Sequence, residues 1–281
     1  MEIFKHIAPL KAFLKDNRRA QKSVGLVPTM GALHSGHLAL VRASGEQNKV
    51  TVSSIYVNPT QFNNPADLAK YPRTFEKDIA MLSEAGCDAL FYPDNQEMYQ
   101  HKTVLKFDFG HLDKVMEGKF RPGHFSGVAL VVSKLFHIVD PDHAYFGQKD
   151  FQQFAIIRQL VSELKFNINL HCIPTLREPD GLAMSSRNLR LTSEERQRAS
   201  VFYKSLLLAK QKLKEGYSVA DVKNEIDKAF TPETKTALEY LELADSINLN
   251  TLDNVSDGNQ PILCIAGYIG EVRLIDNMYL D

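Results

Sequence analysis

Residues 24–44 read VGLVPTMGALHSGHLALVRAS, and this stretch sets the architecture of the chain. The apolar run VGLV is halted by Pro28, and the closing residues LALVRAS have a helical pattern. A continuous apolar run is typical of a strand that is buried on both faces of a parallel sheet. The stretch therefore predicts a strand, a turn with two glycines and two histidines, and a helix that begins near Ser35.

Strand-like runs alternate with helical patterns through the first 175 residues. β-Branched residues are frequent in the segment 49–57, and shorter apolar runs follow at 89–92, 144–146 and 168–173. Between them, the segment 74–85 has the apolar spacing of a helix and is followed by Gly86, a typical helix stop. This alternation predicts a layered α/β domain over residues 1–175, with a Rossmann-like parallel sheet and right-handed crossovers.

The pattern changes after Pro174. The loop REPDGLAMSSRN occupies residues 177–188, and a capping box at Thr192 opens a pattern that predicts one long helix to Lys214. Another helix is expected at 218–230, and two strands at 262–268 and 271–275 flank Gly270. These features predict a boundary near residue 176 and a smaller C-terminal α+β domain over residues 176–281.

The composition restricts the class of protein. The 281 residues include 33 Lys and Arg against 34 Asp and Glu, so the net charge is −1, and apolar types make up 44%. A near-zero charge gives no electrostatic reason to expect a nucleic-acid partner. Three cysteines, odd in number and far apart, predict free thiols in a reducing compartment, the cytoplasm. No uncharged apolar stretch reaches the roughly 20 residues that cross a bilayer, so no membrane partner is expected.

The first candidate site is the turn that contains His34 and His37. If a helix begins near Ser35, its free N–H groups point toward the carboxyl end of the preceding strand, where they suit phosphate oxygens. The imidazoles could donate hydrogen bonds to charge that develops on phosphate, and Gly36 would allow a close backbone approach. Taken alone, the HxGH tetrapeptide is more often an ordinary turn with two partly exposed histidines.

Two further candidate segments lie later in the chain, one directly after the predicted strand at 144–146 and one after the predicted domain boundary. In the segment Gly147-Gln148-Lys149-Asp150 the lysine could neutralise phosphate and the aspartate could accept from ribose hydroxyls, or the pair could be a surface charge and a helix cap. Residues 184–188, MSSRN, combine two hydroxyls with the bidentate fork of an arginine. This loop could close over a nucleotide, or it could be a polar turn that leads into the capping box.

Uncharged and acidic side chains form the last candidates. The amides of Asn58, Gln61 and Gln153 suit recognition of hydroxyls and a carboxylate, although each alone could be a polar loop residue. Asp78 could hold magnesium through nucleotide phosphates, or it could be a solvated carboxylate on a helix.

Considered together, these segments resemble the pantothenate synthetase family. The resemblance rests on VPTMGALHSGH, SIYVNPTQF, YPRTFEKD, MEGKFRPGHFSGV, YFGQKDFQQ, DGLAMSSRN and RLIDN, which occur in this order from about Val27 to Asn277. The family belongs to nucleotidyltransferases with an HxGH or HIGH signature, and MSSRN is similar to a degenerate KMSKS loop. The chain departs from the family at Ser35, where aspartate is frequent, and at Gln148, where glutamate is frequent. These departures leave the proposed ligands in place.

The resemblance implies an activity and its partners. Enzymes of the family adenylate (R)-pantoate with ATP and couple the pantoyl adenylate to β-alanine, which gives pantothenate, AMP and diphosphate for coenzyme A biosynthesis. The implied cofactor is Mg²⁺, which enters with ATP, and the implied assembly is a homodimer. Residues 1–175 would then bind ATP and pantoate, and residues 176–281 would act as a lid. No covalent enzyme nucleophile is required by this chemistry.

The resemblance also implies residue roles. His34, His37, Lys149 and Arg187 would be catalytic, with Lys149 at the α-phosphate, Asp150 at the ribose and Leu176 at the adenine. Gln61 and Gln153 would bind pantoate, Asn58 with Gln61 would border the β-alanine path, and Asp78 would hold Mg²⁺. The implied ATP-binding set is Met30, Gly31, Ala32, Leu33, His34, Ser35, Gly36, His37, Gly147, Gln148, Lys149, Asp150, Leu176, Met184, Ser185, Ser186 and Arg187.

Four alternative functions could be built from the same residues. A related nucleotidyltransferase could transfer AMP to a phosphorylated acceptor and stop there. A synthetase that charges RNA is disfavoured by the neutral composition. A nucleotide sensor could bind ATP without catalysis. A metalloprotein could use His34, His37 and a cysteine as ligands.

Overall fold

The computed structural model describes residues 1–63 and 68–280, and the chain divides into two compact units. The first unit contains residues 1–147 and 156–174, and the second contains residues 148–155 and 175–281. The units separate at residues 174 and 175, one position from the boundary expected near residue 176. The short segment 148–155, expected in the first domain, groups with the C-terminal unit.

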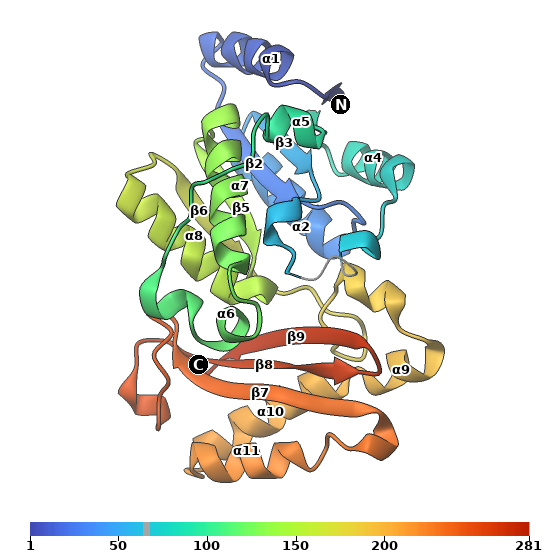
Figure 1. The fold of residues 1–281 in the computed structure, drawn as a ribbon, viewed down its shortest axis with the longest axis vertical. Coiled ribbons are helices and arrows are strands. Elements are labelled where there is room, and N and C mark those ends of the chain that lie inside the picture. Colours follow the sequence, from blue (N-terminus) through green and yellow to red (C-terminus); the bar gives the residue numbers. More distant parts are fainter. Residues whose placement is uncertain (64–67, 281) are drawn as a thin grey trace. The chain divides into compact units, whose positions relative to one another are not determined.

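The first unit contains a six-stranded, fully parallel sheet with the strand order β1-β4-β3-β2-β5-β6 (Figure 1). The predicted Rossmann-like architecture is thereby confirmed. From β2 the chain builds outward through β3 to β4, and β5 and β6 lie on the opposite side of β2, so strand order reverses between β2 and β5. The strands are β1 (Glu2–Phe4), β2 (Val24–Thr29), β3 (Val50–Ile55), β4 (Ala89–Phe91), β5 (His143–Gly147) and β6 (Asn169–Ile173).

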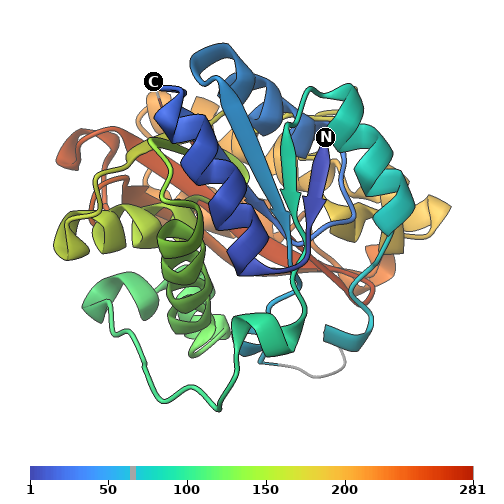
Figure 2. The same cartoon turned by 90° about the horizontal axis from the view of Figure 1, so that it is seen from above.

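Helices cover this sheet. On one face, α2 and α4 contribute Leu40 and Leu82 to a buried cluster that also contains Val27, Leu90 and Tyr145 from the strands. Helices α1 and α7 contact each other, and Figure 2 shows them side by side. The helices and 3₁₀ turns of this unit are α1 (Ile7–Arg19), α2 (Ser35–Gln47), η1 (Pro59–Gln61), α4 (Phe75–Glu84), α5 (Asn95–Met98), η2 (Gly110–Asp113), α6 (Met116–Phe120) and α7 (His124–Val139), with α8 (Phe151–Leu164) beginning in the second unit.

The second unit is an antiparallel sheet of β7, β8 and β9 with α10 and α11 packed against it (Figure 1). Its core includes Phe202 and Leu206 from α10, Ile226 from α11, and Leu243 and Ile265 from the sheet. The elements are η3 (Gln148–Asp150), η4 (Ser186–Arg190), α9 (Ser193–Arg198), α10 (Val201–Lys214), α11 (Val219–Asp227), η5 (Pro232–Thr234), β7 (Thr236–Asp245), η6 (Val255–Asp257), β8 (Pro261–Ile269) and β9 (Val272–Tyr279).

One predicted element is wrong, and several elements, among them β1, α1 and β7, were not predicted. The single long helix expected from Thr192 is divided into α9 and α10 by a turn at residues 199 and 200, and Ala199 and Ser200 are both buried. The capping box at Thr192 is confirmed, since its side chain accepts from the amide of Glu195. Strand β7 reads TALEYLELAD, a run rich in helix-forming residues, and its register is interrupted between Leu238 and Tyr240.

None of the helices formed by residues 1–63 and 68–280 combines the length and the apolar character that crossing a bilayer needs.

Candidate active site

The turn that follows β2 has an unusual backbone. Gly31 and Ala32 both have positive φ angles, +78° and +49°, and for a residue with a Cβ such a conformation costs roughly 1–2 kcal/mol. A side chain at position 31 would also have its Cβ 3.0 Å from Ile55 Cγ2 and 3.1 Å from Asp78 Oδ2. Glycine at position 31 therefore allows the left-handed turn and the close packing around it.

The two histidines cap the helix that follows this turn. The ring Nδ1 of His34, the N-cap of α2, accepts a hydrogen bond from the Gly36 amide at 3.2 Å. The ring Nδ1 of His37 accepts from the His34 amide at 3.3 Å, which completes a reciprocal capping box. The two ring centroids are 4.0 Å apart. The prediction that a helix begins at Ser35 is confirmed by the structure.

These hydrogen bonds assign the tautomer of both rings. A ring nitrogen that accepts from a backbone amide carries no proton, so in the neutral imidazole the proton resides on Nε2. His34 and His37 therefore each keep an Nε2–H group as a donor, at the N-terminus of a helix whose dipole favours anions. Two adjacent donors of this kind suit phosphate oxygens.

Asp78 lies beneath the turn, and its carboxylate is engaged by protein donors. Its Oδ2 accepts from the Ala32 amide at 2.9 Å, and its Oδ1 accepts from the Leu33 amide at 2.8 Å and the Thr74 hydroxyl at 3.0 Å. The residue is 1% exposed. Both oxygens accept from backbone amides and the side chain is almost fully buried, which favours a structural role for this carboxylate; the expected role as a magnesium ligand stays a prediction. Within the described ranges, no group of three or more His, Cys, Asp or Glu side chains could hold a metal ion.

Two of the three amides predicted to contact substrate, those of Asn58 and Gln61, belong to the same unit as this turn. Asn58 is fully buried, and its Nδ2 donates to Gln61 Oε1 at 3.3 Å and to the Gly127 carbonyl at 3.1 Å. Its Oδ1 accepts from the Tyr99 hydroxyl at 2.9 Å and from the Thr60 hydroxyl. Because every polar atom of the Asn58 side chain is used internally, its structural effect is to fix Gln61.

Gln61 in turn reaches the histidine turn. Its Nε2 contacts Met30 Sδ at 2.8 Å, and its backbone carbonyl accepts from Nδ1 of His124 at 2.8 Å. The first unit thus brings together residues 30–37, Asn58 and Gln61 as a polar cluster at the end of β2. His124 was not a predicted site residue, although it belongs to the segment MEGKFRPGHFSGV.

In the second unit, Lys149 and Asp150 lie in η3, directly after Gly147, the last residue of β5. Lys149 Nζ is 3.5 Å from Asp150 Oδ1, and the lysine side chain is mostly buried. Asn277 of β9 holds this segment: its Nδ2 donates to the carbonyl oxygens of Gln148 and Lys149, both at 2.9 Å, and its Oδ1 accepts from Gln148 Nε2 at 3.2 Å.

The loop between Leu176 and Arg187 is a short hairpin. The Met184 amide donates to the Leu176 carbonyl at 3.0 Å, so these two predicted nucleotide contacts are neighbours. Ser185 caps η4 by accepting from the Arg187 amide at 3.2 Å. Ser186 is buried, whereas Met184, Ser185 and Arg187 are half-buried and Leu176 is exposed.

A buried ion pair anchors the same loop. Arg177 donates to both carboxylate oxygens of Asp276, at 2.6 and 3.0 Å, and to the carbonyls of Gly181 and Asn277. Burial raises the pKa of Asp276, while the charges of Arg177 and Lys149 oppose that shift. Arg177, Asp276 and Asn277 were not predicted as site residues, and the segment RLIDN was the signal for the latter two.

The predicted residues therefore form two groups, one in each unit. Residues 30–37, Asn58, Gln61 and Asp78 belong to the first unit with Gly147, and Gln148 to Asp150, Gln153, Leu176 and residues 184–187 belong to the second. Gln153 is half-buried in the first turn of α8. That the two groups meet on one triphosphate remains a prediction.

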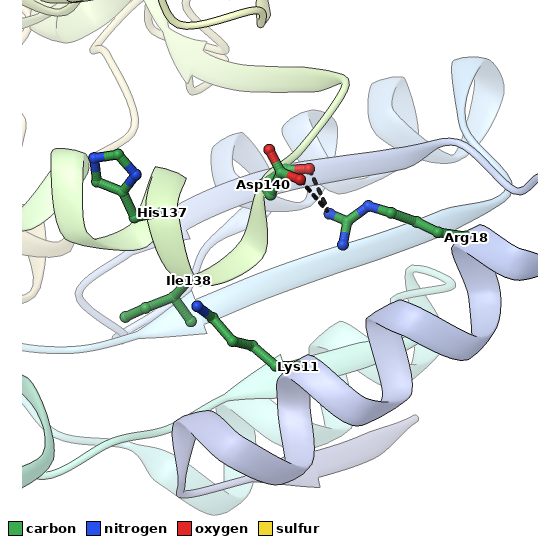
Figure 3. A pocket seen from close by; sticks show the side chains of 5 residues that line it. All are labelled: Lys11, Arg18, His137, Ile138 and Asp140. Atoms are coloured by element: carbon green, nitrogen blue, oxygen red, sulfur yellow. Dashed lines mark hydrogen bonds and ion pairs between the residues drawn. The ribbon is translucent and has the colours of Figure 1, made fainter.

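A separate hollow of about 310 Å³ on the first unit is lined by none of these residues (Figure 3). Lys11 and Arg18 of α1 and residues His137, Ile138 and Asp140 at the end of α7 line it. The Arg18 guanidinium donates to the carbonyls of Val139 and Asp140, so it caps the C-terminus of α7.

Two of the three cysteines have perturbed thiols. Burial raises the pKa of Cys87 and of Cys172 to about 11, so both thiols are protonated near neutral pH.

A doubly wound parallel sheet whose central strand ends at a histidine-capped helix defines an α/β enzyme of the nucleotide-binding type. The model of the family described as Pantoate-beta-alanine ligase matches residues 2–279. Pantothenate synthetase of Cytophaga hutchinsonii is 47% identical over 275 residues, which cover 98% of this chain and 97% of that protein. Pantothenate synthetase of Porphyromonas gingivalis is 47% identical over 278 residues, 99% of each chain.

Solved structures of pantothenate synthetases are similar to this chain over its whole length. The crystal structure of pantothenate synthetase from Thermus thermophilus has a TM-score of 0.92 and 40% identity and covers 100% of this chain and 99% of its own. Pantoate-beta-alanine ligase from Francisella tularensis, in complex with beta-gamma ATP and β-alanine, has a TM-score of 0.82 and 36% identity. The match covers 100% of this chain and 98% of that protein. The chain belongs to the pantoate–β-alanine ligase family. It is an ATP-dependent ligase of pantothenate biosynthesis that joins pantoate to β-alanine, as the sequence resemblance implied.

Proposed function

We propose that the chain performs this ligation in two steps, through a pantoyl adenylate, with the residues of both groups acting on one ATP molecule. The observation that supports the proposal most strongly is the pair of Nε2–H donors on His34 and His37 at the N-terminus of α2. This arrangement places two Nε2–H donors and a helix dipole where phosphate charge would develop.

In the first step the pantoate carboxylate attacks the α-phosphorus of ATP, the bond from that phosphorus to the bridging oxygen breaks, and diphosphate leaves. His34 and His37 donate to phosphate oxygens, while Lys149 and Arg187 neutralise charge on the reacting phosphates. The enzyme supplies alignment and charge stabilisation, since no covalent intermediate with the protein is needed. Asp150 holds the ribose, and Leu176 packs at the adenine.

In the second step the amine nitrogen of β-alanine attacks the acyl carbon of the mixed anhydride, the bond to the phosphate oxygen breaks, and AMP leaves. Gln61 and Gln153 hold pantoate, and Asn58 acts by fixing the Gln61 amide from within the protein. The loop of residues 184–187 closes over the nucleotide, because the anhydride would hydrolyse if water entered.

Magnesium, the homodimer and the cytoplasm also belong to the proposal. Mg²⁺ would accompany ATP through its phosphates, both oxygens of the buried Asp78 carboxylate accept from backbone amides, and no step above uses the metal. The free cysteines at positions 87, 172 and 264 support a reducing compartment such as the cytoplasm. The dimer rests on the family resemblance, and light scattering of the purified chain tests it.

Exchange of labelled diphosphate into ATP tests the reaction. We expect exchange only when pantoate is present, and addition of β-alanine should then give pantothenate, AMP and diphosphate in equal amounts. AMP attached to a phosphorylated acceptor would instead indicate a transferase. ATP binding with no diphosphate release at saturating pantoate would indicate a nucleotide sensor.

A further inference from the structure

The histidine turn has a conformation that its own sequence does not favour. Ala32 has φ +49° directly after Gly31 at φ +78°, although residues with a Cβ rarely adopt positive φ. Such a conformation persists only where surrounding groups hold it. The backbone amides of Ala32 and Leu33 in this turn must therefore be held by a hydrogen-bond acceptor elsewhere in the chain.

Asp78 is that group. Its two carboxylate oxygens accept from two consecutive amides, those of Ala32 and Leu33, at 2.9 and 2.8 Å. The Thr74 hydroxyl, one helical turn earlier, donates to Oδ1 at 3.0 Å and orients the carboxylate. Among the described residues its hydrogen-bond donors are thus two amides and a hydroxyl, and the residue is 1% exposed.

The position of these amides connects Asp78 to the histidines. Leu33 immediately precedes His34, the N-cap of α2, whose backbone amide donates to the His37 ring and whose own ring accepts from Gly36. A change in the Leu33 peptide would therefore rotate the His34 backbone and break the reciprocal cap. The cap is also what keeps the proton of both rings on Nε2.

We infer that Asp78 is a positioning residue that fixes the amides of Ala32 and Leu33 and thereby presents the Nε2–H groups of His34 and His37 to the phosphates. It does so in place of the magnesium-binding role that its carboxylate suggests. The inference rests on the proposed function for its effect on catalysis, but its effect on the two imidazoles is independent of that function.

The test compares Asp78→Asn with Glu76→Gln, the same change of carboxylate to amide at an exposed site on the same helix. We expect Asp78→Asn to lower kcat for diphosphate exchange about 10- to 100-fold, because small misplacements of reacting groups cost up to about this much. KM for ATP and the Mg²⁺ concentration for half-maximal rate should change less than threefold. Glu76→Gln should match the unsubstituted chain.

A magnesium ligand would behave differently. If Asp78→Asn raises the half-saturating Mg²⁺ concentration at least tenfold and regains kcat at saturating Mg²⁺, the inference is overturned. An unchanged kcat in a folded Asp78→Asn variant overturns it equally. Should that variant not fold, as judged by circular dichroism, Thr74→Val replaces it. A two- to fivefold lower kcat at an unchanged Mg²⁺ requirement then supports the inference, and an unchanged kcat overturns it.

Histidine labelled with ¹⁵N separates this inference from the proposed function. In the unsubstituted chain we expect Nδ1 of His34 and His37 to show the chemical shift of an unprotonated nitrogen, and in Asp78→Asn or Thr74→Val to show a shift averaged between tautomers. Identical spectra would overturn the inference even if exchange is active. Conversely, a chain with no exchange activity but the expected spectral change would refute the proposed function and retain Asp78 as the positioning residue.

Discussion

Asn277 offers the sharpest test of how the second half of the proposed site is held together. The substitution Asn277→Asp keeps the shape of the side chain but replaces the Nδ2 donor by an oxygen. In the structure that nitrogen donates to the carbonyls of Gln148 and Lys149 at 2.9 Å each, and Asn277 is 2% exposed. The variant therefore leaves two carbonyl oxygens without their donor and directs a third oxygen toward them.

The size of the effect follows from those contacts. A buried acceptor without a partner costs about 1–3 kcal/mol, and since both contacts are part-buried, the lower part of that range applies and predicts a loss of about 2–3 kcal/mol in the free energy of unfolding. With an m-value of about 3 kcal/mol per molar urea, a loss near 3 kcal/mol lowers the urea midpoint by roughly 1 M. The rate of diphosphate exchange should fall about 10- to 100-fold in the folded variant, because η3 carries Lys149.

Circular dichroism during urea unfolding and diphosphate exchange in the absence of urea measure the two effects. Asn224→Asp, at an exposed position on α11 in the same unit, makes the same chemical change as a control. A folded Asn277→Asp variant with the urea midpoint and exchange rate of this control would refute the argument that Asn277 positions η3. A lower midpoint with an unchanged exchange rate would limit Asn277 to a role in stability.

Three further predictions concern individual side chains. Lys149→Ala should lower the rate of the first step by about 3–4 kcal/mol in activation free energy, as loss of an electrostatic donor does, and near-normal diphosphate exchange would remove Lys149 from the mechanism. Gln153→Ala should raise KM for pantoate more than KM for ATP, and equal effects on both would contradict its assignment to pantoate. Burial lowers the pKa of His171, and His143, whose ring nitrogen lies 2.8 Å away, adds to this shift. The unfolded chain therefore binds more protons than the folded chain below about pH 6.5. The free energy of unfolding should decrease as the pH falls through the lower pKa of the folded chain. Melting temperatures at pH 7.5 and 5.5 test this, and a His171→Asn variant with an undiminished pH dependence would contradict it.

The sequence predicts the parallel sheet well because its strands are continuous apolar runs. The run at residues 24–27 lies within β2, and the predicted helix start at Ser35 is observed because His34 supplies the cap. Such local signals do not depend on the rest of the chain. The same holds for Thr192, whose capping box was visible as a spacing of three residues and is present in α9.

The second unit was harder to predict because its tertiary contacts override local preference. In β7, Leu and Glu residues favour a helix, yet pairing with β8 buries Leu241 and Leu243 against the core. Likewise, nothing in the polar segment after Thr192 indicates that the helix ends at Arg198. The break allows Ala199 and Phe202 to pack into the core of this unit.

Candidate site residues were predictable where the signal is local, but the partners of Asp78 and Asn277 were not, because those partners lie far along the chain. Asp78 is 45 residues beyond Leu33, and Asn277 is 128 residues beyond Lys149. Asp78 supplies acceptors to the turn after β2, and Asn277 supplies a donor to η3. This difference follows from the backbone groups that each turn leaves without an internal partner. A left-handed turn before a helix has free amides, whereas a short 3₁₀ turn has free carbonyls. Residues 30–37 and 148–150 would supply the reactive groups of the proposed site, and both segments are held by hydrogen bonds to these two buried side chains. The HxGH segment alone is therefore not sufficient to build the proposed phosphate site.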